Sequence, residues 1–209
     1  MPKIMQLPLG ALQTNCYILA CEVTNKAAII DPGWNGRLLA DTIEENGWEL
    51  THILLTHSHF DHVGGLKELK ELTNAPIYLH PDGDEMLARS HEIATMYDLE
   101  FPIAPAADVA LEACQTLDVG NLTLHVMYTP GHAPGHVCFY LKEHHVLFDG
   151  DVLFQNSIGR TDLPGGDYDT LMKSIHKKVL PLPDDTHILS GHGAATMLGT
   201  ERQNNPFLR

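Results

Sequence analysis

The stretch THSHFDH, Thr56 to His62, holds three histidines and one aspartate within six residues. The apolar run ILL at 53–55 precedes it, and Gly64-Gly65 followed by LKELKEL comes after it. This order predicts a short buried strand that ends at the cluster and a helix over residues 64–74 that begins beyond it. The ligand-type side chains are therefore expected in a loop between a strand and a helix.

The density of imidazole and carboxylate groups in this stretch predicts a metal site. Alternate residues of an extended segment point the same way, so His57 and His59 can approach one ion together. Once the chain turns, Asp61 and His62 can aim at a neighbouring point. Imidazole nitrogen and carboxylate oxygen are both ordinary zinc ligands. The chain carries 14 histidines in all, but a chance cluster of this density is improbable.

Length and charge limit the classes of partner. A chain of 209 residues, 44% hydrophobic and 19% charged, has the composition of a globular protein with a core of its own. The formal net charge of −14 repels phosphate backbones, so we expect no nucleic-acid partner. A small molecule is the expected substrate, and no obligate protein partner is predicted.

The sequence predicts a cytoplasmic protein with no membrane segment. No apolar run approaches the ~20 residues that span a bilayer, and residues 4–15, IMQLPLGALQTN, are too interrupted for a signal-peptide core. The four cysteines show neither CxxC spacing nor the density of a secreted scaffold. We expect them to be reduced and mostly buried.

Strand and helix patterns alternate along the chain, an order that implies a sheet with helices packed outside it. Apolar periodicity predicts the helices, and β-rich runs bounded by turn residues predict the strands. Residues 101–108, which contain Pro102 and Pro105, and residues 154–168 are expected as loops. The expected helices are 36–47, 64–74, 81–98 and 168–180. The expected strands are 3–8, 15–23, 26–31, 52–56, 75–80, 116–119, 121–129, 137–141, 144–151 and 186–192.

Five of these strands end at a histidine or an aspartate. Sites in sheet proteins are assembled from the loops at strand ends, because the sheet holds those loops in register. The five residues are Asp31, His57, His132, Asp151 and His192. Two roles are open for Asp31, in the turn DPG: it caps its own turn, or it accepts a hydrogen bond that orients a metal-bound histidine.

The candidate ligands exceed the four that a structural zinc site needs, and no thiolate is among them. Two divalent ions fit, with Zn²⁺ as the expected metal and iron or manganese as alternatives. Such a pair can share a hydroxide that forms near neutral pH. The expected set is His57, His59 and His132 for one ion, Asp61, His62 and His192 for the other, and Asp151 as the bridge between them.

In order and spacing these residues resemble the metallo-β-lactamase superfamily. The matching motifs are HxHxDH at 57–62, PGHAPGH at 130–136, DGD at 149–151, GHG at 191–193 and DPG at 31–33. The resemblance covers nearly the whole chain. It implies one domain over residues 1–209 with an α/β fold of the αββα type, a four-layer sandwich of two sheets between helices. It also implies that His132 ligates metal and that His136 has a supporting or structural role.

Three further segments resemble glyoxalase II and its single-domain relatives within that superfamily. They are NCYIL at 15–19, SIGRTDLPGGD at 157–167 and GHGAATMLGTERQNNPFL at 191–208. The resemblance implies a thioesterase, in which a hydroxide between two metal ions attacks a thioester such as S-lactoylglutathione. A thiolate is a tolerable leaving group, because its conjugate acid has a pKa near ~8.5. Asp61 is the candidate catalytic residue, which shuttles a proton while it ligates metal.

Arg160, in the GRTD segment, is the candidate for binding an anionic substrate. Full-length glyoxalase II has a C-terminal helical region that supplies basic residues to glutathione, whereas this sequence ends at Arg209. Arg160 is then the nearest cation to the predicted site. The alternative is a structural arginine paired with Asp162 or Asp151.

Two other functions stay open. Persulfide dioxygenases share this fold and a GRTD segment, and that resemblance implies one iron on His57, His132 and Asp151. His136 stands where a cysteine follows in that family, and DLPGG favours the hydrolase. The second alternative is a non-catalytic metal-binding module that keeps the ligands without turnover.

Overall fold

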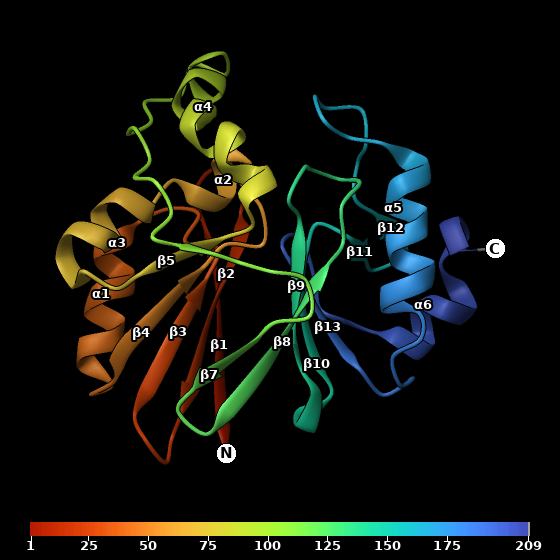
Figure 1. Ribbon diagram of the computed structural model, residues 1–209, viewed down its shortest axis with the longest axis horizontal. Helices are drawn as coiled ribbons and strands as arrows, with labels where there is room; N and C mark the ends of the chain where they lie inside the picture. The colour runs from red at the N-terminus through yellow and green to blue at the C-terminus, as the bar shows by residue number, and fades with distance from the viewer. Residues whose placement is uncertain (209) are drawn as a thin grey trace.

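The computed structural model describes residues 1–208, which form two six-stranded sheets packed against each other (Figure 1). The first sheet has the strand order β1 (Pro2–Leu9), β2 (Thr14–Cys21), β3 (Lys26–Ile30), β4 (Glu49–Leu54), β5 (Ile77–Leu79) and β6 (Val109–Ala110). The second has the order β14 (Thr196–Met197), β13 (His187–Ser190), β10 (Val146–Gly150), β9 (Val137–Leu141), β8 (Leu122–Tyr128) and β7 (Thr116–Val119). A separate two-stranded ribbon pairs β11 (Leu153–Phe154) with β12 (Ser157–Ile158).

Helices lie outside the two sheets (Figure 1). The first half of the chain contributes α1 (Gly36–Glu45), the single turn α2 (Phe60–Val63), α3 (Leu66–Thr73) and α4 (Asp84–Thr95). The second half contributes α5 (Tyr168–Ser174), continued by a π-helical segment at Ile175–Val179, and α6 (Leu198–Asn204). Short 3₁₀ turns lie at Pro81–Gly83, Lys142–His144 and Pro206–Leu208.

Three clusters of buried apolar side chains correspond to three interfaces between layers. The first joins α1 and α3 to the first sheet and includes Leu39 and Leu69. The second lies between the sheets and includes Ile30 and Phe139. The third joins the second sheet to α5 and includes Leu171. The expected four-layer αββα sandwich is therefore confirmed.

Strand β2 shows how its residue types suit an inner layer. All eight residues of TNCYILAC are buried, with Ile18 in the helix-side cluster and Leu19 in the cluster between the sheets. A strand that is covered on both faces is apolar along its length rather than alternating. The central position of β2 follows from this composition.

Most predicted elements are confirmed, with different ends. The helix expected over 36–47 ends at Glu45, and Gly47 follows with a positive φ of 67°, a conformation that glycine adopts without strain. The helix expected over 64–74 begins at Leu66, because the Gly65 N–H bonds to Pro32 O instead of continuing from α2. All four cysteines are free: Cys16, Cys21 and Cys138 are buried, and Cys114 is exposed.

One helix prediction was too long, and several short elements were missed. The helix expected over 81–98 consists of a 3₁₀ turn followed by α4, which ends at Thr95. The helix expected over 168–180 is confirmed to Val179, but it changes from α-helix to π-helix after Ser174. Strands β6, β11, β12 and β14 span two residues each, too few for a periodic pattern, and part of the loop expected over 154–168 is strand β12. Within residues 1–208 no helix is long and apolar enough to cross a membrane.

Candidate metal centre

The predicted strand-end residues meet at one edge of the two sheets. Strands β3 and β4 are parallel, as are β10 and β13, so within each pair the carboxyl ends reach the same edge. The two edges adjoin, because the Val137 N–H at the start of β9 donates to Thr56 O beyond β4, at 2.8 Å. Side chains that follow these strands therefore converge between the sheets.

His57, His59 and His132 form the first group of candidate ligands. Their facing ring nitrogens lie within 4.8 Å of one another. Nδ1 of His59 is 3.1 Å from Nε2 of His57 and 2.8 Å from Nε2 of His132. Three ring nitrogens that face one point are a ligand set for one cation.

Asp61, His62 and His192 form the second group, and Asp151 lies between the two. Oδ2 of Asp61 is 3.0 Å from Nε2 of His192 and 3.6 Å from Nε2 of His62. Asp151 places Oδ2 3.4 Å from Nε2 of His132, in the first group, and Oδ1 3.5 Å from Nε2 of His62, in the second. The structure thus brings all the predicted ligands together, with one carboxylate facing both groups.

Asp31 contacts two of these histidines, one directly and one through Thr56. Its Oδ2 is 3.0 Å from Nδ1 of His62 and accepts the hydroxyl proton of Thr56 at 2.6 Å. Thr56 Oγ1 is also 3.0 Å from Nδ1 of His57. Because Asp31 takes the hydroxyl proton, His57 donates to Thr56 from Nδ1, and Nε2 of His57 keeps its lone pair. The carboxylate bonds away from its own turn, so the geometry favours the orienting role over turn capping.

Burial keeps the first group of histidines neutral. It is the main cause that lowers the pKa of His57, His59 and His132 below the ordinary value, and for His59 the pKa falls to about 3. Neighbouring imidazoles lower the pKa of His57 and His59 further. A neutral imidazole is the form that binds a metal ion.

In the second group, neighbouring opposite charges favour the ionised form of each side chain. Burial opposes the charged form of His62, but the carboxylates of Asp151 and Asp61 raise its pKa well above the ordinary value. Burial likewise opposes ionisation of Asp61, yet His62 and His192 lower its pKa to about 2. The same histidines, with His132, keep the pKa of Asp151 far below its usual range despite burial. Both carboxylates are therefore ionised at neutral pH.

Buried polar atoms without a partner test whether cations fit here. Among the described residues, Nε2 of His62 and Oδ1 of Asp151 are buried and make no hydrogen bond. Leaving such a group unsatisfied costs about 1–3 kcal/mol. A cation between them would satisfy both, and imidazole and carboxylate ligands suit a divalent metal. The residues present therefore fit divalent ions.

His136 is a buried neighbour of the cluster rather than a member of either group. Its Nε2 accepts the backbone N–H of Asp151 at 3.2 Å, so Nδ1 carries the proton and faces Thr129 Oγ1 at 3.1 Å. Its ring also stacks on His57, with centroids 4.9 Å apart. These contacts agree with the supporting role expected for His136.

Two threonines and one backbone carbonyl support the cluster without a sequence signal of their own. Thr14 Oγ1 donates to Asp61 Oδ2 at 2.9 Å, and Thr56 links Asp31 to His57. Arg160 O accepts from Nδ1 of His132 at 2.8 Å. Threonines are common in strands, and a carbonyl oxygen belongs to every residue, so only the fold identifies these partners.

The Arg160 side chain pairs with Asp162 and not with Asp151. Its Nε and Nη2 bond to the two oxygens of Asp162 at 2.7 and 2.8 Å, and both side chains are more than half exposed. The hydrogen bond and the charge of Asp162 raise the pKa of Arg160. Of the two pairings considered for a structural arginine, the one with Asp162 is confirmed.

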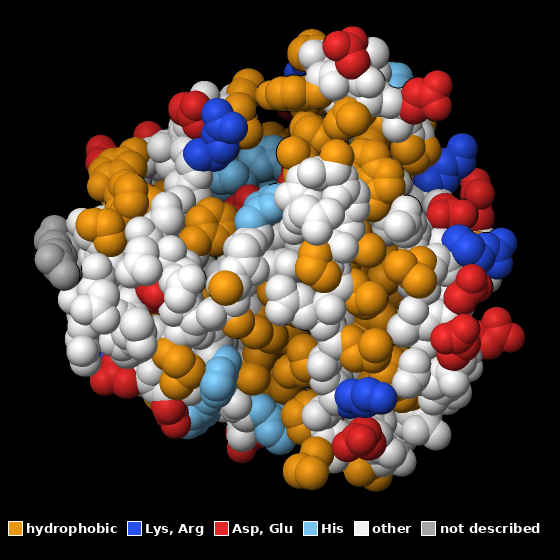
Figure 2. Space-filling view, turned by 180° about the vertical axis from the view of Figure 1, so that it is seen from behind, with side chains coloured by type: hydrophobic (Ala, Val, Ile, Leu, Met, Phe, Trp, Pro, Cys, Tyr) orange, Lys and Arg blue, Asp and Glu red, His pale blue; other side chains and the backbone are white. Residues whose placement is uncertain are grey.

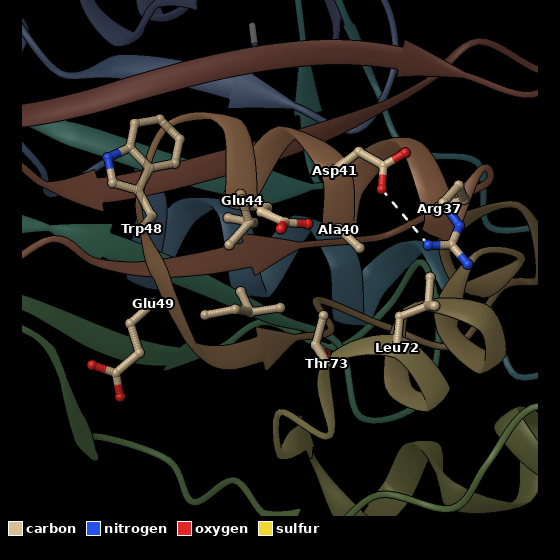
Figure 3. A pocket seen from close by; sticks show the side chains of 10 residues that line it. Arg37, Ala40, Asp41, Glu44, Trp48, Glu49, Leu72 and Thr73 are labelled. Carbon is tan, nitrogen blue, oxygen red and sulfur yellow. Dashed lines mark ion pairs between the residues drawn. The ribbon is translucent and has the colours of Figure 1, made fainter.

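The cluster is accessible from the surface at His192, whose side chain is 31% exposed. Figure 2 shows histidine side chains in a hollow near the top of that face, with hydrophobic side chains on one side and a Lys or Arg side chain on the other. A different pocket lies between α1, β4 and α3 (Figure 3). It is bordered by the exposed ion pair Arg37–Asp41, at 3.7 Å, and none of its lining residues is a candidate ligand. We therefore assign the chemistry to the ligand cluster and not to this pocket.

Comparisons with known proteins agree with this architecture. A family model for the metallo-beta-lactamase superfamily matches residues 9–192. A probable metallo-hydrolase of Bacillus subtilis, YqgX, is 42% identical over 208 residues, which cover 99% of this chain and 97% of the relative. Hydroxyacylglutathione hydrolase GloC of Haemophilus influenzae is 41% identical over 97% of this chain and 96% of the relative. The crystal structure of TTHA1623 in a di-iron-bound form matches with a TM-score of 0.90 and 39% identity over 98% of this chain and all of that one.

An αββα sandwich with histidines and aspartates clustered at the shared edge of its sheets defines a class of metal-dependent hydrolases. The extent of the family match and the similarity of the relatives place the chain within one family. It belongs to the metallo-beta-lactamase superfamily. The predicted resemblance is therefore confirmed, and the chain is a metallo-hydrolase of that superfamily.

Proposed function

We propose that this hydrolase cleaves thioesters of the S-lactoylglutathione kind at a site with two divalent ions. The observation that carries the proposal is the position of Asp151, whose two oxygens face different groups of candidate ligands. Zn²⁺ is the expected metal, with iron or manganese as alternatives. The proposed ligands are His57, His59 and His132 for one ion, Asp61, His62 and His192 for the other, and Asp151 for both.

The metal pair and the protein divide the chemistry. Two divalent ions supply, when bound, a water that is deprotonated near neutral pH and a positive field for the developing charge on a carbonyl oxygen. Asp61 is the proposed proton carrier, since its Oδ2 lies beside His192 Nε2 and accepts a hydrogen bond from Thr14. A thiolate leaves without a strong acid, so Asp61 need only transfer one proton to it.

Arg160 is proposed to bind an anionic end of the substrate. Its backbone carbonyl contacts His132, and its side chain is 59% exposed. Exposed ion pairs contribute at most about 1 kcal/mol, so a substrate carboxylate can replace Asp162 at little cost. The bidentate geometry that Arg160 uses with Asp162 suits any carboxylate.

The choice of a thioester is supported by the relative GloC, which is named a hydroxyacylglutathione hydrolase. That match extends over 97% of this chain and 96% of the relative. The Arg160 side chain adds an independent argument for an anionic substrate. The proposed partner is thus a small-molecule thioester, with no nucleic acid or obligate protein partner.

One experiment tests the proposal: metal quantification of the purified chain, paired with hydrolysis of S-lactoylglutathione. We expect about two divalent ions per chain and release of free thiol. The matched control is His52→Ala, which removes a half-buried histidine of β4 that packs against the Tyr78 ring outside the cluster. Metal content and turnover should not change in that variant.

The same measurements separate the two alternatives. One iron per chain with rapid oxygen uptake on glutathione persulfide would indicate a persulfide dioxygenase instead of a hydrolase. Bound metal without turnover of any thioester or lactone would indicate a non-catalytic metal-binding module. Within residues 1–208 Asp151 faces both the group His57, His59 and His132 and the group Asp61, His62 and His192, which is more than a single iron on His57, His132 and Asp151 requires.

A further inference from the structure

A row of aromatic rings extends outward from the ligand cluster. Phe60 directly follows His59, and its ring centroid lies 5.5 Å from that of Tyr97 and 6.1 Å from that of Phe101. Phe101 meets Trp34 edge-on at 5.5 Å. We call these four rings, Trp34, Phe60, Tyr97 and Phe101, the aromatic wall. The wall begins one residue from a candidate metal ligand.

Trp34 and Phe101 of the wall are held by close packing, whereas the Tyr97 ring is exposed to solvent. A Cβ added at Gly64 would lie 2.8 Å from Trp34 and 3.0 Å from Phe101, so the backbone of this glycine approaches both rings closely. Tyr97, in contrast, is 58% exposed, and the adjacent Met96 is 78% exposed. Contiguous exposed apolar side chains mark binding sites more often than isolated ones do.

The exposed ring and the cation that we assign to the substrate both connect to the ligand cluster. Tyr97 does so through Phe60, at 5.5 Å, which directly follows His59. Arg160 in turn contacts the cluster through its carbonyl and His132. A substrate held at the cluster therefore has an aromatic ring and a guanidinium among the side chains near it.

Resting on the thioester hydrolysis proposed above, we propose that the aromatic wall binds an apolar acyl group and that Tyr97 sets the preference for acyl length. The thiol portion, with its carboxylates, then lies toward Arg160. A flat ring offers apolar area to a hydrocarbon chain but few hydrogen bonds to a small hydroxyacyl group. The preferred substrates are therefore thioesters with acyl groups of several carbons, and S-lactoylglutathione is a poorer one.

The test compares S-hexanoylglutathione with S-acetylglutathione on the metal-loaded enzyme. Burial of one methylene is worth up to about fourfold, so we expect kcat/KM to be more than about tenfold higher for the hexanoyl thioester. Tyr97→Ser should reduce this ratio at least about fivefold, while Tyr97→Phe should retain it because the ring remains. Val23→Ser, at an exposed residue between β2 and β3, is the control in which the ratio and the activity stay unchanged.

A binding measurement separates failure of the wall from failure of the hydrolase. S-hexylglutathione and S-methylglutathione are thioethers that cannot be hydrolysed, and calorimetry should show tighter binding of the hexyl compound, lost in Tyr97→Ser. Equal kcat/KM for the two thioesters, with normal turnover, would refute the role proposed for the aromatic wall and leave the proposed function intact. No turnover of either thioester, with the hexyl preference in binding present, would support the wall and refute the thioesterase.

Discussion

Oδ2 of Asp31 lies 3.0 Å from Nδ1 of His62, and both side chains are almost fully buried. The same oxygen accepts the hydroxyl proton of Thr56, which contacts His57. One carboxylate therefore fixes the orientation of an imidazole in each of the two proposed ion sites. Partners of this kind hold the ring and its tautomer in the state that binds metal.

Replacement of Asp31 by asparagine should weaken metal binding without unfolding the protein. Asparagine has the same shape and tolerates the positive φ of 52° at this position. The carboxylate accepts at Oδ2 from His62 and the Thr56 hydroxyl and at Oδ1 from the Thr56 N–H, whereas an amide has only one accepting oxygen. We therefore expect about 10–100-fold lower metal affinity. Competition with a chromophoric chelator at neutral pH measures the change.

The control for Asp31→Asn is Asp185→Asn. Asp185 pairs with Nδ1 of His145 at 2.9 Å, nearly the same geometry, but these side chains are 68% and 42% exposed. The surface substitution should leave metal affinity unchanged. Equal affinity in wild type and Asp31→Asn would show that Asp31 does not orient the ligands.

His57→Ala should remove about one ion per chain and abolish hydrolysis. His57 belongs to the first group only, so the ligands of the second group remain. Loss of several kcal/mol of charge stabilisation predicts a decrease in kcat of about 10³-fold or more. The far-UV circular dichroism should be retained, because the buried clusters of the four layers do not include this residue. Unchanged turnover would refute the proposed site.

The two aspartates of the DGD motif should respond differently to the same substitution. Asp151→Asn should lower the content of both ions, because its oxygens face both groups. Asp149 is fully buried, and burial raises its pKa well above the ordinary value. Burial therefore disfavours a charge on Asp149, and asparagine, which is uncharged, can still accept from the Leu153 N–H through its amide oxygen. Asp149→Asn should retain its metal, and metal analysis of the two variants checks the contrast.

Tyr128→Phe should make stability less dependent on pH in the alkaline range. Burial and the bond from Tyr128 to Oδ2 of Asp82, at 2.7 Å, raise the pKa of Tyr128 from 10.0 to about 12. Between these values the folded chain keeps a proton that the unfolded chain releases. The stabilisation is thus complete below pH 10 and is lost as the pH rises towards 12. Urea unfolding of both proteins from pH 9 to 12, at equal metal content, measures the slopes. Identical slopes would contradict the assignment.

Local patterns predicted the regular elements best where a single segment contains the whole signal. Helix α1 packs Leu39 and Ile43 inward one turn apart and ends before Gly47, as its periodicity indicates. The predicted continuation of α4 to Asp98 was wrong. Acidic and apolar residues continue past Thr95 and suggest more helix, but α4 ends at Thr95. Tyr97 there contacts Phe60, 37 positions away in the sequence, and no local pattern contains that contact.

The sequence alone determined which chemical groups are available and where they leave their strands: HxHxDH, the later His132, Asp151 and His192, and the apolar runs before them. Only the tertiary structure decided which nitrogen of each imidazole faces the cluster, that Asp31 serves both groups, and that Tyr97 packs on Phe60 beside a candidate ligand. The physical reason is that ligand type and strand spacing are local properties of the chain. Orientation depends on hydrogen bonds between residues far apart in sequence, such as His62 with Asp31 and His132 with Arg160.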